Sequence, residues 1–163
     1  MAKKVLIISA SDSDLSIMQD AGKILEEFGV EYELTISSAH RSPDRTVKLV
    51  NEFHKSGGKI IICGAGLAAH LAGVVAAHFP LPVIGIPLKK GPFVGVDALL
   101  STMQMPSGIP VATVGIDGAK NAAILAVQIL ATSDKSLEEK LVEYKSKLAK
   151  GVEEKAEKLK AND

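Results

Sequence analysis

Short apolar runs alternate with helical patterns along this chain, and the alternation restricts the fold more than any other feature. The runs that read as strands occupy residues 4–9, 31–37, 59–64, 82–87 and 110–116. Most are apolar throughout, which is typical of strands covered on both faces of a parallel sheet, whereas 31–37 alternates as an edge strand does. Because crossovers are right-handed, we expect an α/β fold, a three-layer αβα sandwich around a flavodoxin-like or Rossmann-like parallel sheet.

The segments between these runs carry helix signals. Apolar residues recur at helical spacing over 13–28 and stop at Gly29, a usual C-cap, and Pro43 marks the first turn of the next helix. A third amphipathic pattern covers 117–130, and a long, highly charged helix is expected from about 134 to 160. The length of 163 residues and the lack of internal repeats predict a single domain over 1–163.

Charge and apolar runs narrow the partners and the location. Nineteen basic residues balance nineteen acidic ones, so nucleic acid is not expected as the main partner. The apolar stretch from Val5 to Ile8 is too short for a signal peptide, and no run approaches a membrane span. The single cysteine, Cys63, can form no disulfide within the chain. We therefore expect a cytoplasmic protein that does not contact a membrane.

Residues 67–79 are apolar nearly all round, unlike the other helical segments. A helix of that kind should be buried on several sides. In a chain this small, other subunits are the simplest cover for the extra face. The sequence therefore predicts a homo-oligomer with this segment in the contact region.

Polar and glycine-rich segments follow the predicted strands at 9–14, 37–44, 64–70, 87–97 and 115–121. In an open parallel sheet, ligands bind beyond the carboxyl ends of the strands, so these segments should form one rim.

The first segment carries Ser11, Ser13 and Asp14 where a helix begins. Free backbone N–H groups and two hydroxyls suit a phosphate, and a carboxylate can accept from ribose hydroxyls. Serine and aspartate are also ordinary helix N-caps, and on this segment alone the capping interpretation is favoured.

His40 and Arg41 lie together in the second segment, "SSAHRSPD". The guanidinium of arginine is a fixed cation suited to phosphate, and histidine is the side chain that titrates near neutrality. Because the pair lies opposite a possible phosphate site, a functional role is as well supported as a structural one. His70 follows "GAG" near a helix start, where a structural role with a satisfied hydrogen bond is the competing interpretation.

The sequence offers little for a metal or an organic cofactor. The four histidines have no metal-ligand spacing, and neither HExxH nor CxxC occurs. "GAGLAA" lacks the third glycine of a dinucleotide motif, and no GxxxxGK[ST] loop is present. We expect neither a metal nor a cofactor.

Five stretches, "SDSD", "SSAHRSPD", "GAGLAAHLAG", "GVDALLSTMQMPSGIPVATVGI" and "NAAILAVQIL", occur in this order. Over residues 4 to about 131 they closely resemble the class I 5-(carboxyamino)imidazole ribonucleotide mutases of purine (IMP) biosynthesis, the catalytic PurE family. The resemblance implies a flavodoxin-like fold, usually an octamer with active sites shared between subunits. It also implies a small-molecule nucleotide substrate, an isomerisation without metal or cofactor, and functional coupling to a carboxylating, ATP-dependent synthetase.

In that family the carboxylate moves from the exocyclic nitrogen to ring carbon C4, giving 4-carboxy-5-aminoimidazole ribonucleotide. The resemblance makes His40 the general acid and base and His70 a pocket histidine near the carboxylate. The remaining matches are to substrate-binding positions: Ser11, Ser13 and Arg41 at the phosphate, Asp14 at the ribose, Ser38 and Ala39 beside the base, and the stretch Gly64, Ala65 and Gly66 with Leu71 along the substrate.

The chain departs from the family pattern at several positions. Ala10 and Leu67 stand where glycine is usual, Ala72 where proline is common and Ser42 where threonine is usual, and the loop 89–95, "KKGPFVG", is atypical. Two rival interpretations remain. One is the class II carboxylase, which uses CO2 directly and which Arg41 and His70 disfavour, and the other is a non-catalytic nucleotide- or flavin-binding module.

Overall fold

The apolar runs form a single parallel sheet. The computed structural model describes residues 3–160, and its five strands have the order β2-β1-β3-β4-β5. This is the flavodoxin-like order, and every pairing is parallel. The doubly wound α/β prediction is confirmed. The strands are β1 (Val5–Ser9), β2 (Tyr32–Ile36), β3 (Ile60–Gly66), β4 (Val83–Leu88) and β5 (Ala112–Thr113).

Helices connect the strands. They are the 3-10 turn η1 (Asp12–Asp14), then α1 (Leu15–Phe28), α2 (Pro43–Lys55), α3 (Leu71–His78), α4 (Val96–Met103), α5 (Ala119–Ala131) and α6 (Lys135–Lys160). Gly29, at φ 71°, ends α1 as predicted because glycine accepts the left-handed conformation. The expected apolar helix at 67–79 is shorter, since α3 begins only at Leu71. The sequence did not predict α4.

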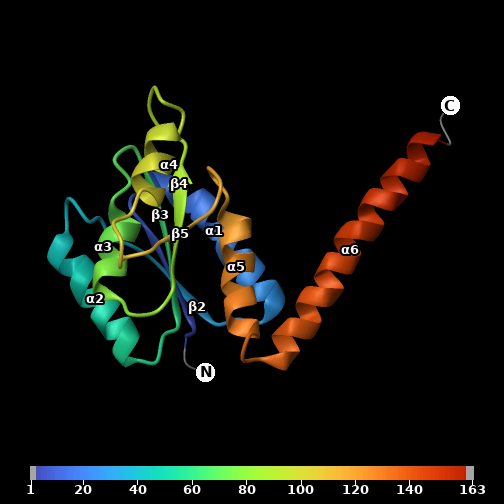
Figure 1. The fold of residues 1–163 in the computed structure, drawn as a ribbon, viewed down its shortest axis with the longest axis horizontal. Helices are drawn as coiled ribbons and strands as arrows, with labels where there is room; N and C mark the ends of the chain where they lie inside the picture. The colour runs from blue at the N-terminus through green and yellow to red at the C-terminus, as the bar shows by residue number, and fades with distance from the viewer. Residues whose placement is uncertain (1–2, 161–163) are drawn as a thin grey trace. The chain divides into compact units, whose positions relative to one another are not determined.

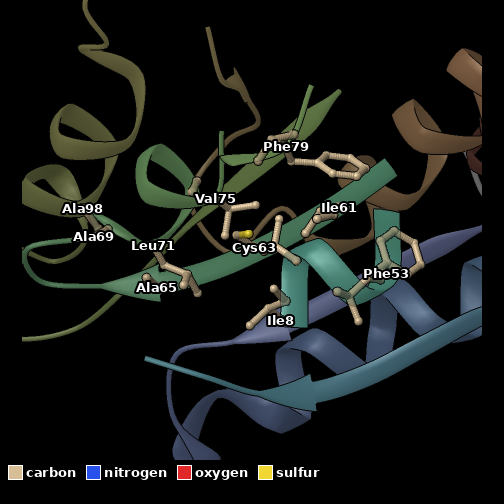
Figure 2. Packing of buried hydrophobic residues seen from close by; sticks show 14 residues of the cluster. Ile8, Phe53, Ile61, Cys63, Ala65, Ala69, Leu71, Val75, Phe79 and Ala98 are labelled. Carbon is tan, nitrogen blue, oxygen red and sulfur yellow. The ribbon is translucent and has the colours of Figure 1, made fainter. Parts of the chain in front are cut away.

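The helices cover the sheet on two faces. In Figure 1, α2 and α3 lie on one side of the sheet and α1 on the other. One core cluster joins Ile8, Ile61 and Cys63 of the sheet to Phe53 of α2 and Val75 of α3 (Figure 2). Alternate strand residues point to the opposite face, where α1 buries Met18, Ala21 and Leu25. The three-layer prediction is therefore confirmed.

The two edges of the sheet differ from each other. β2 is an edge strand with half-buried residues, as its alternating pattern predicted. β5 has only two residues where the sequence indicated a strand over 110–116, so that length was wrong. Pro110 has no N–H to donate to a neighbouring strand. After Val114, whose amide donates to the Gly85 carbonyl at 3.1 Å, the chain turns, and Asp117 takes a left-handed φ of 56°.

The chain divides into two compact units between Ala126 and Val127. In the second unit, Asp134 caps α6, because its Oδ1 accepts from the amide of Ser136 at 3.1 Å. The rest of α6 is mostly exposed and charged, with an i,i+4 pair of 2.7 Å between Glu143 and Lys147. The single domain expected over 1–163 stays a prediction. Within residues 3–160, no helix is both long and apolar enough to cross a membrane.

Candidate active site

A cavity of about 480 Å³ opens at the carboxyl end of the sheet. It is lined by the segments that follow β1, β2, β3 and β4, which meet there because the strands are parallel neighbours. The predicted site residues around it are Ser11, Asp14, Ser38, Ala39, His40, Arg41, Ala65, Gly66, His70 and Leu71. Four further lining residues were not predicted as site residues: Ala10, Leu67, Ala68 and Lys90.

Two predicted residues do not line this cavity. Ser13 lies beside it, with its hydroxyl 3.0 Å from that of Ser11 and 2.8 Å from Lys90 Nζ. Gly64 is inside the sheet, and a Cβ there would collide with the sulfur of Met18 on α1. The absence of a side chain at Gly64 therefore serves the packing of α1 on the sheet. It does not open room for a ligand in this cavity.

The segment after β2 is fixed by its own hydroxyl groups. Ser37 and Thr46 are both buried and share a hydrogen bond of 2.8 Å between their hydroxyls. The Ser38 amide donates to Ser42 Oγ at 3.1 Å, and the Arg41 amide donates to Ser38 Oγ at 3.2 Å. The bonds close a compact turn before α2. His40 and Arg41 are thereby presented at a defined place.

His40 and His70 contact each other across the cavity. His40 Nε2 lies 3.0 Å from His70 Nδ1, and the rings meet edge to face with centroids 5.0 Å apart. One nitrogen must carry a proton and the other must accept it, since two lone pairs or two N–H groups would repel. The two imidazoles, from segments thirty residues apart, can therefore act as one proton-transfer unit.

The loop after β1 brings an acidic group near the predicted phosphate ligands. Asp12 Oδ1 accepts from the Ser11 hydroxyl at 3.0 Å and from the Ser13 amide at 2.9 Å. These two hydrogen bonds, the Ser11 bond foremost, hold the pKa of Asp12 below its usual value. Arg41 Nη2 donates to the Ala10 carbonyl at 3.3 Å and so ties the loop after β1 to the segment after β2. In this arrangement the Ser11 hydroxyl must turn from Asp12 to donate to a phosphate.

Asp14 is the N-terminal neighbour of α1, but it does not cap the helix. Neither Ser11 nor Asp14 makes a side-chain cap bond, so the capping interpretation favoured for this segment was wrong. Asp14 Oδ1 instead pairs with Lys90 Nζ at 2.7 Å. Asp14 Oδ2 is buried and has no hydrogen-bond partner among residues 3–160. In the sequence, the only indication that Lys90 belongs to the site is its position in the segment after β4.

The turn after β3 is unusual in its backbone. Leu67 adopts φ 59°, in the left-handed region that glycine accepts most readily. This is the position where the family pattern usually has glycine. The backbone thus keeps a conformation that suits glycine, although the residue is leucine. The Leu67 side chain is half exposed and lines the cavity.

Other chemistry is poorly supported at this cavity. Cys63 is fully buried in the core, and burial raises the pKa of its thiol, which makes it a weak nucleophile. Within residues 3–160, no group of three or more His, Cys, Asp or Glu side chains is placed to hold a metal ion.

The cavity combines three kinds of surface. Arg41 and Lys90 supply positive charge, and the serines supply hydroxyl donors, which suits a phosphorylated molecule. The imidazole pair can move a proton. Small apolar residues, Ala39, Ala65 and Ala68 among them, line part of the wall. Such a site can bind a small phosphorylated compound and transfer a proton on it.

Comparison with known protein families gives a match over most of the chain. A family model described as AIR carboxylase matches residues 4–151. The N5-carboxyaminoimidazole ribonucleotide mutase of Pyrococcus horikoshii is 54% identical over 153 residues, covering 94% of this chain and 86% of that protein. The phosphoribosylaminoimidazole carboxylase of Schizosaccharomyces pombe is also 54% identical over 153 residues, which make up only 28% of its length.

The fold is also shared with a solved structure. A crystal structure of PurE from Treponema denticola superposes with a TM-score of 0.86 at 32% sequence identity. The superposition covers 92% of this chain and 94% of that one. The overall fold of this chain is therefore one already seen by experiment.

Proposed function

The chain belongs to the AIR carboxylase family, which includes the PurE mutases, and we therefore infer that it is an N5-carboxyaminoimidazole ribonucleotide mutase of purine biosynthesis. It is an isomerase that converts this substrate to 4-carboxy-5-aminoimidazole ribonucleotide. The observation that carries the inference is the His40 and His70 pair beside Arg41 in one cavity. The cation can bind the phosphate of the substrate, and the imidazole pair can transfer the proton that the reaction moves.

The reaction requires a proton to change places. The bond between the exocyclic nitrogen and the carboxyl group breaks, and the nitrogen takes a proton from His40 as CO2 leaves. Ring carbon C4 then attacks the retained CO2 and gives its own proton back to His40. The sum is an isomerisation with no net gain or loss of protons. The apolar wall of the cavity favours retention of CO2 over its loss to water.

The binding roles follow the same positions. Arg41 and the hydroxyls of Ser11 and Ser13 bind the phosphate, and Asp14 accepts hydrogen bonds from the ribose. Through its 3.0 Å contact with His40, His70 fixes which ring nitrogen of His40 carries a proton. His70 also lies near the migrating carboxylate. The base is bordered by the following residues: Ser38, Ala39, Ala65, Gly66 and Leu71.

We further propose a homo-octamer in the cytoplasm. α3 supports association, because Ala77 and His78 are exposed on the single chain while the helix is apolar almost throughout. Neighbouring subunits would complete the active sites, and a carboxylating, ATP-dependent synthetase would supply the labile substrate. Sedimentation at micromolar concentration tests the assembly, and a monomer there would contradict it.

Ultraviolet absorbance tests the proposed reaction. Purified protein is mixed with freshly prepared N5-carboxyaminoimidazole ribonucleotide, and in parallel with aminoimidazole ribonucleotide and bicarbonate. Fast formation of the C4-carboxylated product in the first reaction alone, abolished in His40→Asn, is the expected result. Product from the second reaction at a comparable rate would identify a direct carboxylase instead. Silence in both reactions would leave a nucleotide- or flavin-binding protein.

A further inference from the structure

We propose that Lys90 is a positioning residue of this site, which fixes the Asp14 carboxylate as a hydrogen-bond acceptor for ligand hydroxyls. The loop after β4 carries Lys90, whereas Asp14 lies in the loop after β1. The proposal rests on the proposed function only for the identity of the ligand. Its content, a cation that acts through Asp14, comes from the contacts of these two side chains.

The contacts of Lys90 are specific. An ammonium group has three N–H donors. One is directed to Asp14 Oδ1 at 2.7 Å and another to Ser13 Oγ at 2.8 Å. Lys90 therefore holds an acidic and a hydroxyl side chain of the same loop, and its own side chain, 31% exposed, borders the cavity.

The second oxygen of Asp14 lacks a hydrogen-bond partner within the described part of the chain. The Asp14 side chain is only 4% exposed, and it lines the cavity. Its Oδ2 has no hydrogen-bond donor among residues 3–160. Burial of an unpaired carboxylate oxygen is unfavourable, so a donor from a bound molecule would improve its environment. With Oδ1 occupied by Lys90, Oδ2 is the acceptor left for a hydroxyl.

The methylene chain of Lys90 packs against the backbone of Gly66. A Cβ added to Gly66 would lie 2.8 Å from Cδ and 3.0 Å from Cγ of Lys90. The backbone at Gly66 thus lets the lysine stem pass close to the end of β3 on its way to Asp14. The position of the ammonium is set by packing as well as by charge.

Removal of the ammonium should act through Asp14. A buried carboxylate without its counter-charge is strongly disfavoured, so it would turn away from its buried position. An Asp14 that has turned away no longer offers Oδ2 as an acceptor at this place. Lys90 therefore does not need to touch the reacting atoms in order to affect binding.

The experiment compares Lys90→Met with Lys89→Met. Lys89 is an exposed neighbour of equal charge, and only its backbone amide has an assigned contact, a 2.9 Å bond to Asp117. Calorimetry measures the Kd for 4-carboxy-5-aminoimidazole ribonucleotide, and steady-state assays measure kcat and KM. We expect Kd and KM to rise about tenfold or more in Lys90→Met, with kcat within about threefold of the unchanged protein. Lys89→Met should leave all three constants within about twofold.

A double-mutant cycle separates positioning from a general structural effect. In an Asp14→Asn background, Lys90→Met should raise Kd by less than about threefold, because the group it positions is gone. Lys90→Arg should recover part of the affinity, since a cation returns. Equal Kd values for Lys90→Met and Lys89→Met, or an undiminished effect in Asp14→Asn, would overturn the proposal.

Failure of the proposed function would look different. An unchanged protein that neither binds the ribonucleotide product nor turns over the substrate would reject the mutase assignment itself. An unchanged protein that does both, together with a Lys90→Met variant of normal affinity, would reject only the role of Lys90. Thermal unfolding of each variant shows that affinity is compared between folded proteins.

Discussion

The segment after β2 and the loop after β4 both bring a cation to the cavity, but they are built in different ways. Residues 37–42 bond to one another and to Thr46 through buried or half-buried hydroxyls. The loop 89–95 has left-handed residues at Gly91, Val94 and Gly95 and an exposed apolar tip, where Phe93 is 65% exposed.

The difference separates two ways of placing a charge. The backbone of Arg41 is fixed by a hydrogen bond within its own turn, and its guanidinium makes one further bond, to the Ala10 carbonyl. Lys90 reaches the site on a long side chain and is held at its far end by Asp14. A group needed at a fixed position suits the first arrangement, and a group that secures another side chain suits the second.

The largest effect should come from the proton-transfer residue of the fixed segment. His40→Asn is expected to lower kcat by about 10²- to 10⁴-fold while the Kd for the product changes little, because general acid and base catalysis is lost. Product formation followed by absorbance, with calorimetry for binding, measures both. His54→Asn, a change outside the cavity, is the control. A His40→Asn variant with normal kcat would show that His40 is not the acid and base of the reaction.

Arg41→Ala should raise KM by about 10- to 100-fold, because a charge-assisted contact with phosphate contributes about 1.5–3 kcal/mol. Initial rates over a range of substrate concentrations check this. Lys48→Ala is the control, since Lys48 is an exposed cation on α2 that lines neither of the two cavities bordered by Arg41. Equal KM values for the two variants would count against a phosphate at Arg41.

Thr46→Val tests whether buried hydroxyls fix the segment after β2. It leaves the Ser37 hydroxyl, 2% exposed, without its partner, so we expect a loss of about 1–3 kcal/mol in the free energy of unfolding. Urea unfolding monitored by circular dichroism measures it. Thr132→Val, at an exposed threonine, should cost far less. Equal losses in the two variants would show that the buried pair has no special part.

Phe93→Ser should have the smallest effect on stability. The ring is mostly exposed at the tip of the loop after β4, so the free energy of unfolding should change by less than about 0.5 kcal/mol. The same urea titration applies. Phe53→Ser removes a ring that is only 6% exposed in the core, and it shows how much free energy of unfolding is lost with a buried ring. A large loss in Phe93→Ser, under conditions where the protein is dilute, would mean that the loop is packed and not free.

The sheet could be predicted from the sequence because its signal is local. Buried parallel strands such as β1 and β3 are continuous apolar runs, and the alternation of β2 marks it as an edge. α4 was missed because "VDALLSTM" adjoins a loop rich in proline and glycine and has no clear cap. β5 was drawn too long because apolar composition does not show where strand pairing ends.

The site was predictable to the extent that it depends on strand ends. Segments after neighbouring parallel strands must meet, and this places Ser11, His40 and His70 around one cavity. Lys90 could not be assigned in the same way, because its role depends on how far a side chain reaches toward Asp14. Gly64 shows the opposite case: the sequence predicted it as a substrate-binding residue, but its lack of a side chain makes room for Met18 of α1.

The close passage of the Lys90 stem over Gly66 couples these two positions through packing. A side chain added at position 66 would displace the stem of Lys90, and the displaced ammonium could leave Asp14 without its counter-charge. Loss of the lysine would in turn free the space beside position 66. The effect of a substitution at one position therefore depends on the residue at the other, although the two lie at the ends of different strands.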